Sequence, residues 1–295
     1  MKPFICVKDG ITRDYNKREF DYFICFEDDK PDEYTELSQD KFFVANGFEE
    51  FIRLHRPYGL RVRAETQEEL DYFIDKIHPF VVSLDLVLKH SRSFDLTPLE
   101  KCSKLEAIQF YWNTKQDTLW DIKKNSNLKY FEMTDYYKIS DCSSFCGSSI
   151  EVLKLFGCNS LSSFVSKMHI EDLSFILKMP NLRELYLDII KDKSSEYYLD
   201  LFSKCANLRV LSNPDGFFTF QQFAWLKAHL PNVQWGLHCV WKHQDFAQII
   251  GKRMPRFLTE PKKIAEYQKR YDALVDKYKS VDEPPNDDDK FLPIA

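Results

Sequence analysis

The stretch from residue 150 to 161, IEVLKLFGCNSL, constrains the fold more than any other part of the chain. Its first apolar side chains stand at offsets 0, 3 and 5 from Ile150, and Cys158 follows at offset 8. Leu153 and Leu155 are two residues apart, so in a β-strand both point to one face while Lys154 points to the other. The spacing therefore predicts a short strand with one buried face, followed by a bend.

The same phase recurs along the chain. It reappears at Leu182, Leu185 and Leu187, and the copy that starts at Leu105 carries Asn113 in the position of Cys158. One such unit cannot bury its leucines alone, because only stacked units make a continuous core. The repeat therefore predicts parallel strands, one per copy, with starts spaced by 24, 24, 23, 22, 32, 26 and 25 residues. The starts are Pro57, Val81, Leu105, Leu128, Ile150, Leu182, Leu208 and Val233.

This pattern resembles the leucine-rich repeat family over about residues 57–238. Six of the seven spacings lie within the range of about 20–29 residues that is typical of that family. The resemblance implies an α/β leucine-rich repeat solenoid, with a curved parallel β-sheet on the concave side and helices and irregular turns on the convex side. The end copies depart from the pattern at Pro57 and Gly236, as capping repeats do. Strands scattered in a mixed sheet are the alternative architecture.

The rest of the sequence predicts a cap at each end of the repeats. Residues 1–56 are expected to form an N-terminal cap, with a strand at 20–26 and a short helix after Gly47. The repeats are expected to occupy 57–239. A C-terminal capping segment with an amphipathic helix from Pro261 is expected at 240–280. Residues 281–295 have the composition of a mobile acidic tail.

Apolar residues between the strands predict what covers the convex side. Leu70, Phe73, Ile74 and Ile77 recur at helical spacing, so a helix is expected there. Full helices are also expected around 170–177, 198–202 and 220–230. The connections after the Leu105 and Leu128 strands are too short for long helices, and single turns are expected instead.

Composition and charge indicate the cellular compartment and argue against some classes of binding partner. The net charge is 41 − 46 = −5, which argues against general nucleic-acid binding. The sequence lacks the apolar run of roughly 18 residues that a membrane span needs, and its first residues lack a signal-peptide core. The eight cysteines are not spaced as a disulfide ladder, so buried thiols in the reducing cytoplasm are expected.

The residues between the buried positions of each strand are expected to face the concave side, and they include several aromatic side chains. Exposed aromatic side chains in a cluster are typical of a protein interface, where charged neighbours add specificity. A cap or insert that folds over them is the alternative. The candidate partner-binding residues are Arg61, Arg63, Asp85, Tyr111, Trp112, Glu132, Lys154, Phe156, Tyr186 and Asp188.

The resemblance therefore implies a non-catalytic protein–protein interaction module that binds its partner through the concave face, an expectation drawn from the fold alone. One alternative is an immunity- or inhibitor-type protein that neutralises a specific toxin or enzyme. Another is a nucleic-acid or anion binder that uses the basic residues in 252–270.

Enzyme chemistry is not expected. The backbones of Asp85 and Glu132 should lie roughly 10 Å apart, a separation that suits a glycosidase pair, but nothing else in the sequence supports that activity. The cysteine and histidine groups at 142–146 and 238–243 lack the paired spacing of zinc sites. We therefore predict no catalytic residues, no metal and no cofactor.

Overall fold

The computed structural model describes residues 3–7, 22–26, 41–44, 59–111, 113–136, 138–156, 170, 172–187, 195–212, 218–251 and 256–286. They belong to two compact units, Met1–Asn181 and Leu182–Ala295. Strands and helices occur in both units, which confirms the α/β class. No helix within these ranges is long and apolar enough to cross a membrane.

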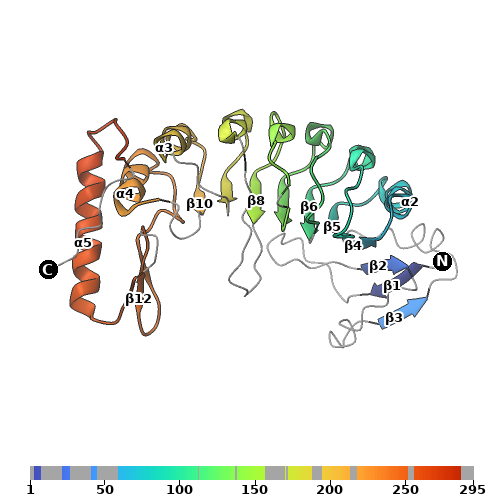
Figure 1. Ribbon diagram of the computed structural model, residues 1–295, viewed down its shortest axis with the longest axis horizontal. Helices are drawn as coiled ribbons and strands as arrows, with labels where there is room; N and C mark the ends of the chain where they lie inside the picture. Colours follow the sequence, from blue (N-terminus) through green and yellow to red (C-terminus); the bar gives the residue numbers. More distant parts are fainter. Residues whose placement is uncertain are drawn as a thin grey trace. The chain divides into compact units, whose positions relative to one another are not determined.

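The sheet of the first unit follows the predicted repeat (Figure 1). Strands β4 (Gly59–Ala64), β5 (Ser83–Leu88), β6 (Ala107–Tyr111), β7 (Tyr130–Thr134) and β8 (Val152–Phe156) pair in parallel and in chain order. Each lies where a copy of the apolar pattern places it, and β4 begins two residues after Pro57.

Three strands near the N-terminus extend this sheet beyond β4. β2 (Tyr22–Phe26) pairs with β4 in parallel, which confirms the strand expected at 20–26. β1 (Pro3–Val7) lies antiparallel between β2 and β3 (Lys41–Val44), and neither β1 nor β3 was predicted. The helix expected after Gly47 falls outside the described residues.

The strand register aligns the apolar positions into two rows, both buried. Offset 3 of each copy forms one row and offset 5 forms the other, because neighbouring strands pair one whole repeat apart. Aromatic rings pack within and between copies behind the sheet: Phe131 lies 5.6 Å from Phe110 of the preceding copy and 4.8 Å from Phe145 of its own copy, measured between ring centroids. The rows are Leu60, Leu84, Ile108, Phe131 and Leu153, and Val62, Leu86, Phe110, Met133 and Leu155.

The helix and the 3-10 turns that follow strands β4–β8 lie on one side of these strands (Figure 1). α2 (Gln67–Ile77) buries the four predicted apolar residues. η4 (Thr97–Lys101), η5 (Ile122–Lys124) and η6 (Ser143–Phe145) are short 3-10 turns, as expected for η5 and η6. The full helix expected around 170–177 is wrong. The described residues there form the 3-10 helix η7 (Leu173–Lys178), and Pro180 disfavours helical backbone at the residue before it.

Polar side chains in the bends pair with the backbone as the repeat predicts. The Asn113 amide oxygen accepts hydrogen bonds from the backbone N–H groups of Lys115 and Gln116, and its amide nitrogen donates to the Arg92 carbonyl at 3.0 Å. Asn113 is fully buried. Its side chain therefore satisfies backbone groups where the chain leaves β6, which an apolar residue there would leave unpaired.

The second unit begins with two further parallel strands, β9 (Glu184–Leu187) and β10 (Val210–Ser212). The copy that starts at Val233 adds a single parallel bridge between Trp235 and Val210. α3 (Ser195–Ser203) and α4 (Phe220–His229) confirm the helices expected around 198–202 and 220–230. A three-stranded antiparallel sheet follows, which the sequence analysis missed: β11 (Val240–Lys242), β12 (Ala247–Ile249) and β13 (Arg256–Leu258).

α5 (Pro261–Tyr278) starts at the predicted proline and packs against α4. The buried Tyr271 hydroxyl donates to the Leu237 carbonyl at 2.7 Å. The structure describes residues 281–286 of the segment that is expected to be a mobile acidic tail. Trp225 Nε1 donates to the Val281 carbonyl at 3.0 Å and Gln222 Nε2 donates to the Pro285 carbonyl at 3.2 Å, so these two residues are hydrogen-bonded to α4. Residues 287–295 fall outside the described ranges.

Thr66 caps α2, and its replacement by alanine should lower the free energy of unfolding by about 1 kcal/mol. Its hydroxyl accepts the Glu69 N–H at 3.3 Å, while the Glu69 carboxylate accepts the Thr66 N–H at 3.3 Å. Urea unfolding of Thr66→Ala measures the loss. The exposed Thr118 serves as control, because Thr118→Ala should leave the midpoint unchanged. Equal midpoints for the wild type and Thr66→Ala would show that the cap contributes nothing.

Candidate binding face

One polar side chain per strand forms a row across β4–β8, on the face opposite the apolar rows. The register pairs Arg61 with Asp85, Asp85 with Gln109, Gln109 with Glu132, and Glu132 with Lys154. These five residues, which we call the polar ladder, run cation, anion, amide, anion, cation. The register therefore brings four of the predicted binding residues, Arg61, Asp85, Glu132 and Lys154, into one row with Gln109.

Each carboxylate of the polar ladder is paired with a cation on the neighbouring strand. Arg61 Nε donates to Asp85 Oδ2 at 2.6 Å. The Tyr130 hydroxyl donates to Glu132 Oε2, and Lys154 Nζ lies 4.0 Å from the same oxygen and 5.0 Å from the centroid of the Tyr130 ring. Parallel strands about 4.8 Å apart make such pairs direct neighbours.

The expected exposure of this row is wrong for its centre. Asp85 and Glu132 are 0% exposed and Gln109 is 4% exposed, whereas Arg61 and Lys154 at the two ends are half-buried. Burying an unpaired charge costs far more than burying a paired one. The cross-strand pairs explain how these carboxylates can be buried, and the centre of the ladder does not present an open surface.

A second row lies two residues further along each strand, and its side chains are more exposed than the centre of the polar ladder. Arg63, Val87, Tyr111, Thr134 and Phe156 are in register. The side chains of Arg63, Val87 and Phe156 are half-buried, whereas Thr134 is buried. Of the other predicted binding residues, Tyr186 lies on β9 in the second unit. The side chain of Tyr111 and all of Trp112 and Asp188 lie outside the described residues.

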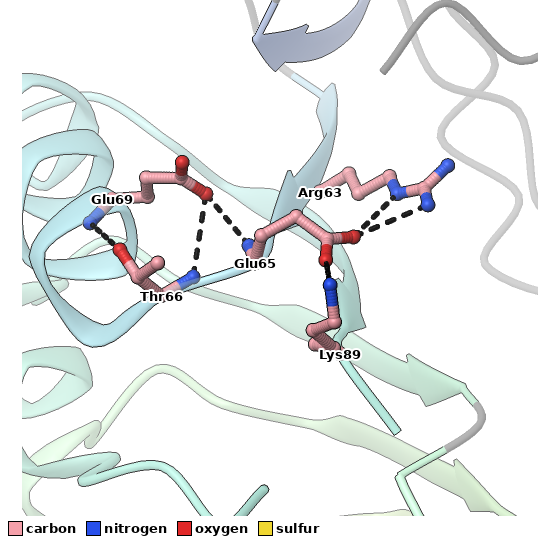
Figure 2. Close-up of polar contacts among 5 residues, drawn as sticks. All are labelled: Arg63, Glu65, Thr66, Glu69 and Lys89. Atoms are coloured by element: carbon pink, nitrogen blue, oxygen red, sulfur yellow. Dashed lines mark hydrogen bonds and ion pairs between the residues drawn. The ribbon is translucent and has the colours of Figure 1, made fainter. Parts of the chain in front are cut away.

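A second charged group lies where β4 and β5 end, shown in Figure 2. Glu65 accepts hydrogen bonds from Arg63, at 3.3 and 3.2 Å, and from Lys89 Nζ. Glu65 and Lys89 both occupy offset 8 of their copies. Asn113 holds the same position in the copy that starts at Leu105. Burial alone would raise the pKa of the Glu65 carboxyl, but Lys89 and Arg63 outweigh it and lower that pKa below its ordinary value.

The Glu65 pairs should make stability depend on pH. A carboxyl whose pKa is lowered by folding stabilises the fold above its unfolded pKa, and loses that contribution as the pH falls through its folded pKa. Glu65→Gln should therefore cost about 0.5–1 kcal/mol at pH 7, a size typical of partly exposed pairs. The difference from the wild type should shrink below about pH 4. Urea titrations from pH 7 to pH 3 measure it, and a difference that grows on acidification would contradict this sign.

The second unit has an exposed aromatic surface that sequence reasoning largely missed. Trp235 is 43% exposed and Phe257 is 63% exposed. Trp235 lies in the degraded copy that starts at Val233, and Phe257 lies on β13, beyond the repeats. β11 and β13 are only three residues each, too short for alternation alone to locate this surface in the sequence.

The thiols have the properties of packing residues. Cys102, Cys142, Cys146, Cys205 and Cys239 are free. Burial raises the pKa of Cys102 and of Cys142 to about 12, so neither is a thiolate near neutral pH. No group of three or more His, Cys, Asp or Glu side chains in the described part of the chain is arranged to hold a metal ion.

No protein-family model matches this sequence, and no curated protein matches it either.

Proposed function

We propose that the chain is a leucine-rich repeat solenoid and acts as a non-catalytic module that binds another protein through the face of its parallel strands. One observation carries the proposal: the register displays one side chain per strand, in rows, on the face opposite the apolar core. Such a surface varies residue by residue without disturbing the core, which suits recognition.

Burial divides this face into two parts with different roles. The polar ladder is buried at its centre and paired across strands, so it fixes the strands and orients its ends. Arg63, Val87 and Phe156 lie one row further on and retain accessible surface, so they contact the partner. Tyr111 belongs to this row by register, and we expect it and Trp112 to contribute aromatic contacts.

The location and the alternatives follow from the same proposal. Buried, protonated thiols such as Cys102 and Cys239 are compatible with a reducing compartment, and we propose the cytoplasm. An immunity or inhibitor protein would use the same face and differ only in its partner. The basic alternative has less support, because Lys263 on α5 is paired with Glu260 at 2.7 Å.

Affinity capture tests the proposal with two double variants of the full chain. Arg63→Ala/Phe156→Ala removes a cation and an apolar side chain from the proposed binding row. Lys101→Ala/Leu177→Ala removes the same two kinds of side chain from exposed positions on η4 and η7. We expect a partner to bind the wild type and the control equally, and to bind Arg63→Ala/Phe156→Ala at least about 10-fold more weakly. A partner held equally by all three proteins would contradict the proposed face.

A further inference from the structure

β13 is an edge strand of the three-stranded sheet in the second unit. The sheet has the order β11-β12-β13, so one side of β13 pairs with β12 and no described strand pairs with its other side. Pro255 and Pro261 flank β13 in the sequence, and proline contributes no N–H to a ladder. The two prolines therefore confine any further strand pairing to a short edge.

The hydrogen-bond phase of the sheet determines which backbone groups of β13 face this open edge. The His243 N–H donates to the Phe246 carbonyl at 2.8 Å, where β11 turns into β12. Hydrogen-bonded pairs recur at every second residue of an antiparallel ladder, so Trp241 and Gln248 form the next one. The backbone groups of Gln248 therefore point to β11 and away from β13.

Phe257 is the direct partner of Gln248 on β13, so this pair is not hydrogen-bonded. The residues on either side of Gln248 point to β13 instead, and they pair with Leu258 and Arg256. The N–H and C=O of Phe257 consequently point away from β12, to the open edge, where no described residue bonds to them. An edge that presents a backbone donor and acceptor in this way is a template for another strand.

The side chain at this edge is also accessible. Phe257 is 63% exposed, the highest value for a large apolar side chain in the described part of the chain. Phe246 in the neighbouring turn is 36% exposed, and the two ring centroids are 5.6 Å apart. Proteins commonly protect a free edge with charged side chains, whereas this edge has an aromatic ring at its centre. Backbone and side chain therefore both favour a strand partner with an apolar residue opposite Phe257.

We propose that β13 pairs antiparallel with β13 of a second copy of this chain, about a two-fold axis at Phe257. In that register each Phe257 N–H donates to the Phe257 carbonyl of the other copy, and the two rings lie side by side on one face. Arg256 stands opposite Leu258, so no residue of the strand is paired with a like charge. The two three-stranded sheets thereby join into one continuous sheet.

The length of the edge argues for a second copy rather than a longer strand from another protein. β13 has three residues, and among them Phe257 directs its backbone groups outward. A second β13 matches this edge, because the outward groups of both copies are satisfied and each exposed ring covers the other. A longer foreign strand would gain the same two hydrogen bonds and leave further backbone groups on that side unpaired. This contact lies outside β4–β8, so it does not depend on the proposed protein-binding function.

Sedimentation velocity of the full chain over a concentration series tests the proposal, because a dimer raises the mean mass toward twice that of one chain. Phe257→Glu places two like charges at the two-fold axis and should raise the Kd of the dimer at least about 10-fold. Phe257→Pro removes the outward N–H but none of the bonds to β12, so it should also weaken the dimer. Leu177→Glu adds the same charge at a side chain that is 46% exposed in the first unit, and should leave the dimer unchanged.

Disulfide trapping tests the register and keeps the proposal testable if the dimer is weak. Hydrogen-bonded residue pairs have Cα atoms about 5.5 Å apart, within the range that a disulfide spans. Phe257→Cys should therefore form a disulfide-linked dimer on mild oxidation. The wild type should not, and neither should Phe246→Cys, whose thiol lies on the exposed turn away from the axis.

Several results would overturn the proposal. They are a monomer at all concentrations with no trapped dimer, a dimer that Phe257→Glu leaves intact, equal trapping from positions 257 and 246, or a monomer whose β13 edge pairs with a strand of a different protein. Partner capture through Arg63 and Phe156 should be the same for the wild type and Phe257→Glu. A failure of this inference is therefore distinguishable from a failure of the proposed function.

Discussion

Replacing Arg61 with methionine should lower the free energy of unfolding by about 3 kcal/mol, because it removes the guanidinium that is paired at 2.6 Å with the fully buried Asp85 carboxylate. Adding Asp85→Leu to Arg61→Met should recover much of the stability, since a well-packed apolar residue often replaces a buried ion pair at little cost. Urea unfolding of the wild type and both variants at pH 7 measures the loss and the recovery.

The matched control for this prediction lies on the same strand. Arg63 is two residues from Arg61 and pairs with Glu65, but its side chain is 33% exposed and its partner is 17% exposed. Arg63→Met should therefore cost less than about 1 kcal/mol. Equal losses for the two arginine variants would mean that the polar ladder contributes no more than a surface pair, and its structural role would be wrong.

Gly236→Ala should also destabilise the protein by about 3 kcal/mol or more. Gly236 has a φ of 99°, a conformation that costs other residues about 1–2 kcal/mol, and a Cβ there would lie 1.9 Å from the backbone oxygen of Leu211. The backbone of β10 cannot move aside without disturbing its pairing with β9. The glycine that breaks the leucine pattern at this copy is thus required by a close approach of two backbones.

Gly147 provides the control for the close approach. It also has positive φ, 74°, but nothing lies within 4 Å of where its Cβ would be. Gly147→Ala should cost only the conformational part, about 1–2 kcal/mol. Thermal or urea unfolding of both variants compares the two glycines. If Gly236→Ala lowers the free energy of unfolding no more than Gly147→Ala does, the Leu211 backbone can shift at little cost and the prediction is wrong.

The apolar repeat predicted the strands and their register because it reports burial directly. Leu153 and Leu155 are apolar since both lie in the core, and a whole-repeat register aligns them with Phe131 and Met133. The same logic located α2, α3 and α4. It failed at η7, where Pro180 limited the helix and Leu177 remained 46% exposed despite its apolar spacing.

The burial and pairing of the polar side chains could not be predicted from the periodicity of the sequence. Alternation assigns Asp85 and Glu132 to the face opposite the leucines, but it does not tell whether that face is open or covered. Their burial and their pairing with Arg61 and Lys154 depend on neighbours that lie a repeat away in sequence. The exposed Phe257 was missed for a related reason, because β11, β12 and β13 are three residues each and too short for periodicity to reveal.

Site-specific photo-crosslinking tests the central claim most directly. A benzoylphenylalanine placed at Val87 samples the proposed binding row on β5, and one placed at Lys101 samples η4 on the opposite side of the strands. With both proteins folded as judged by their melting, irradiation in native extract should yield a discrete adduct with one partner from position 87 and none from position 101. An adduct from position 101 alone would contradict binding through the face of the parallel strands.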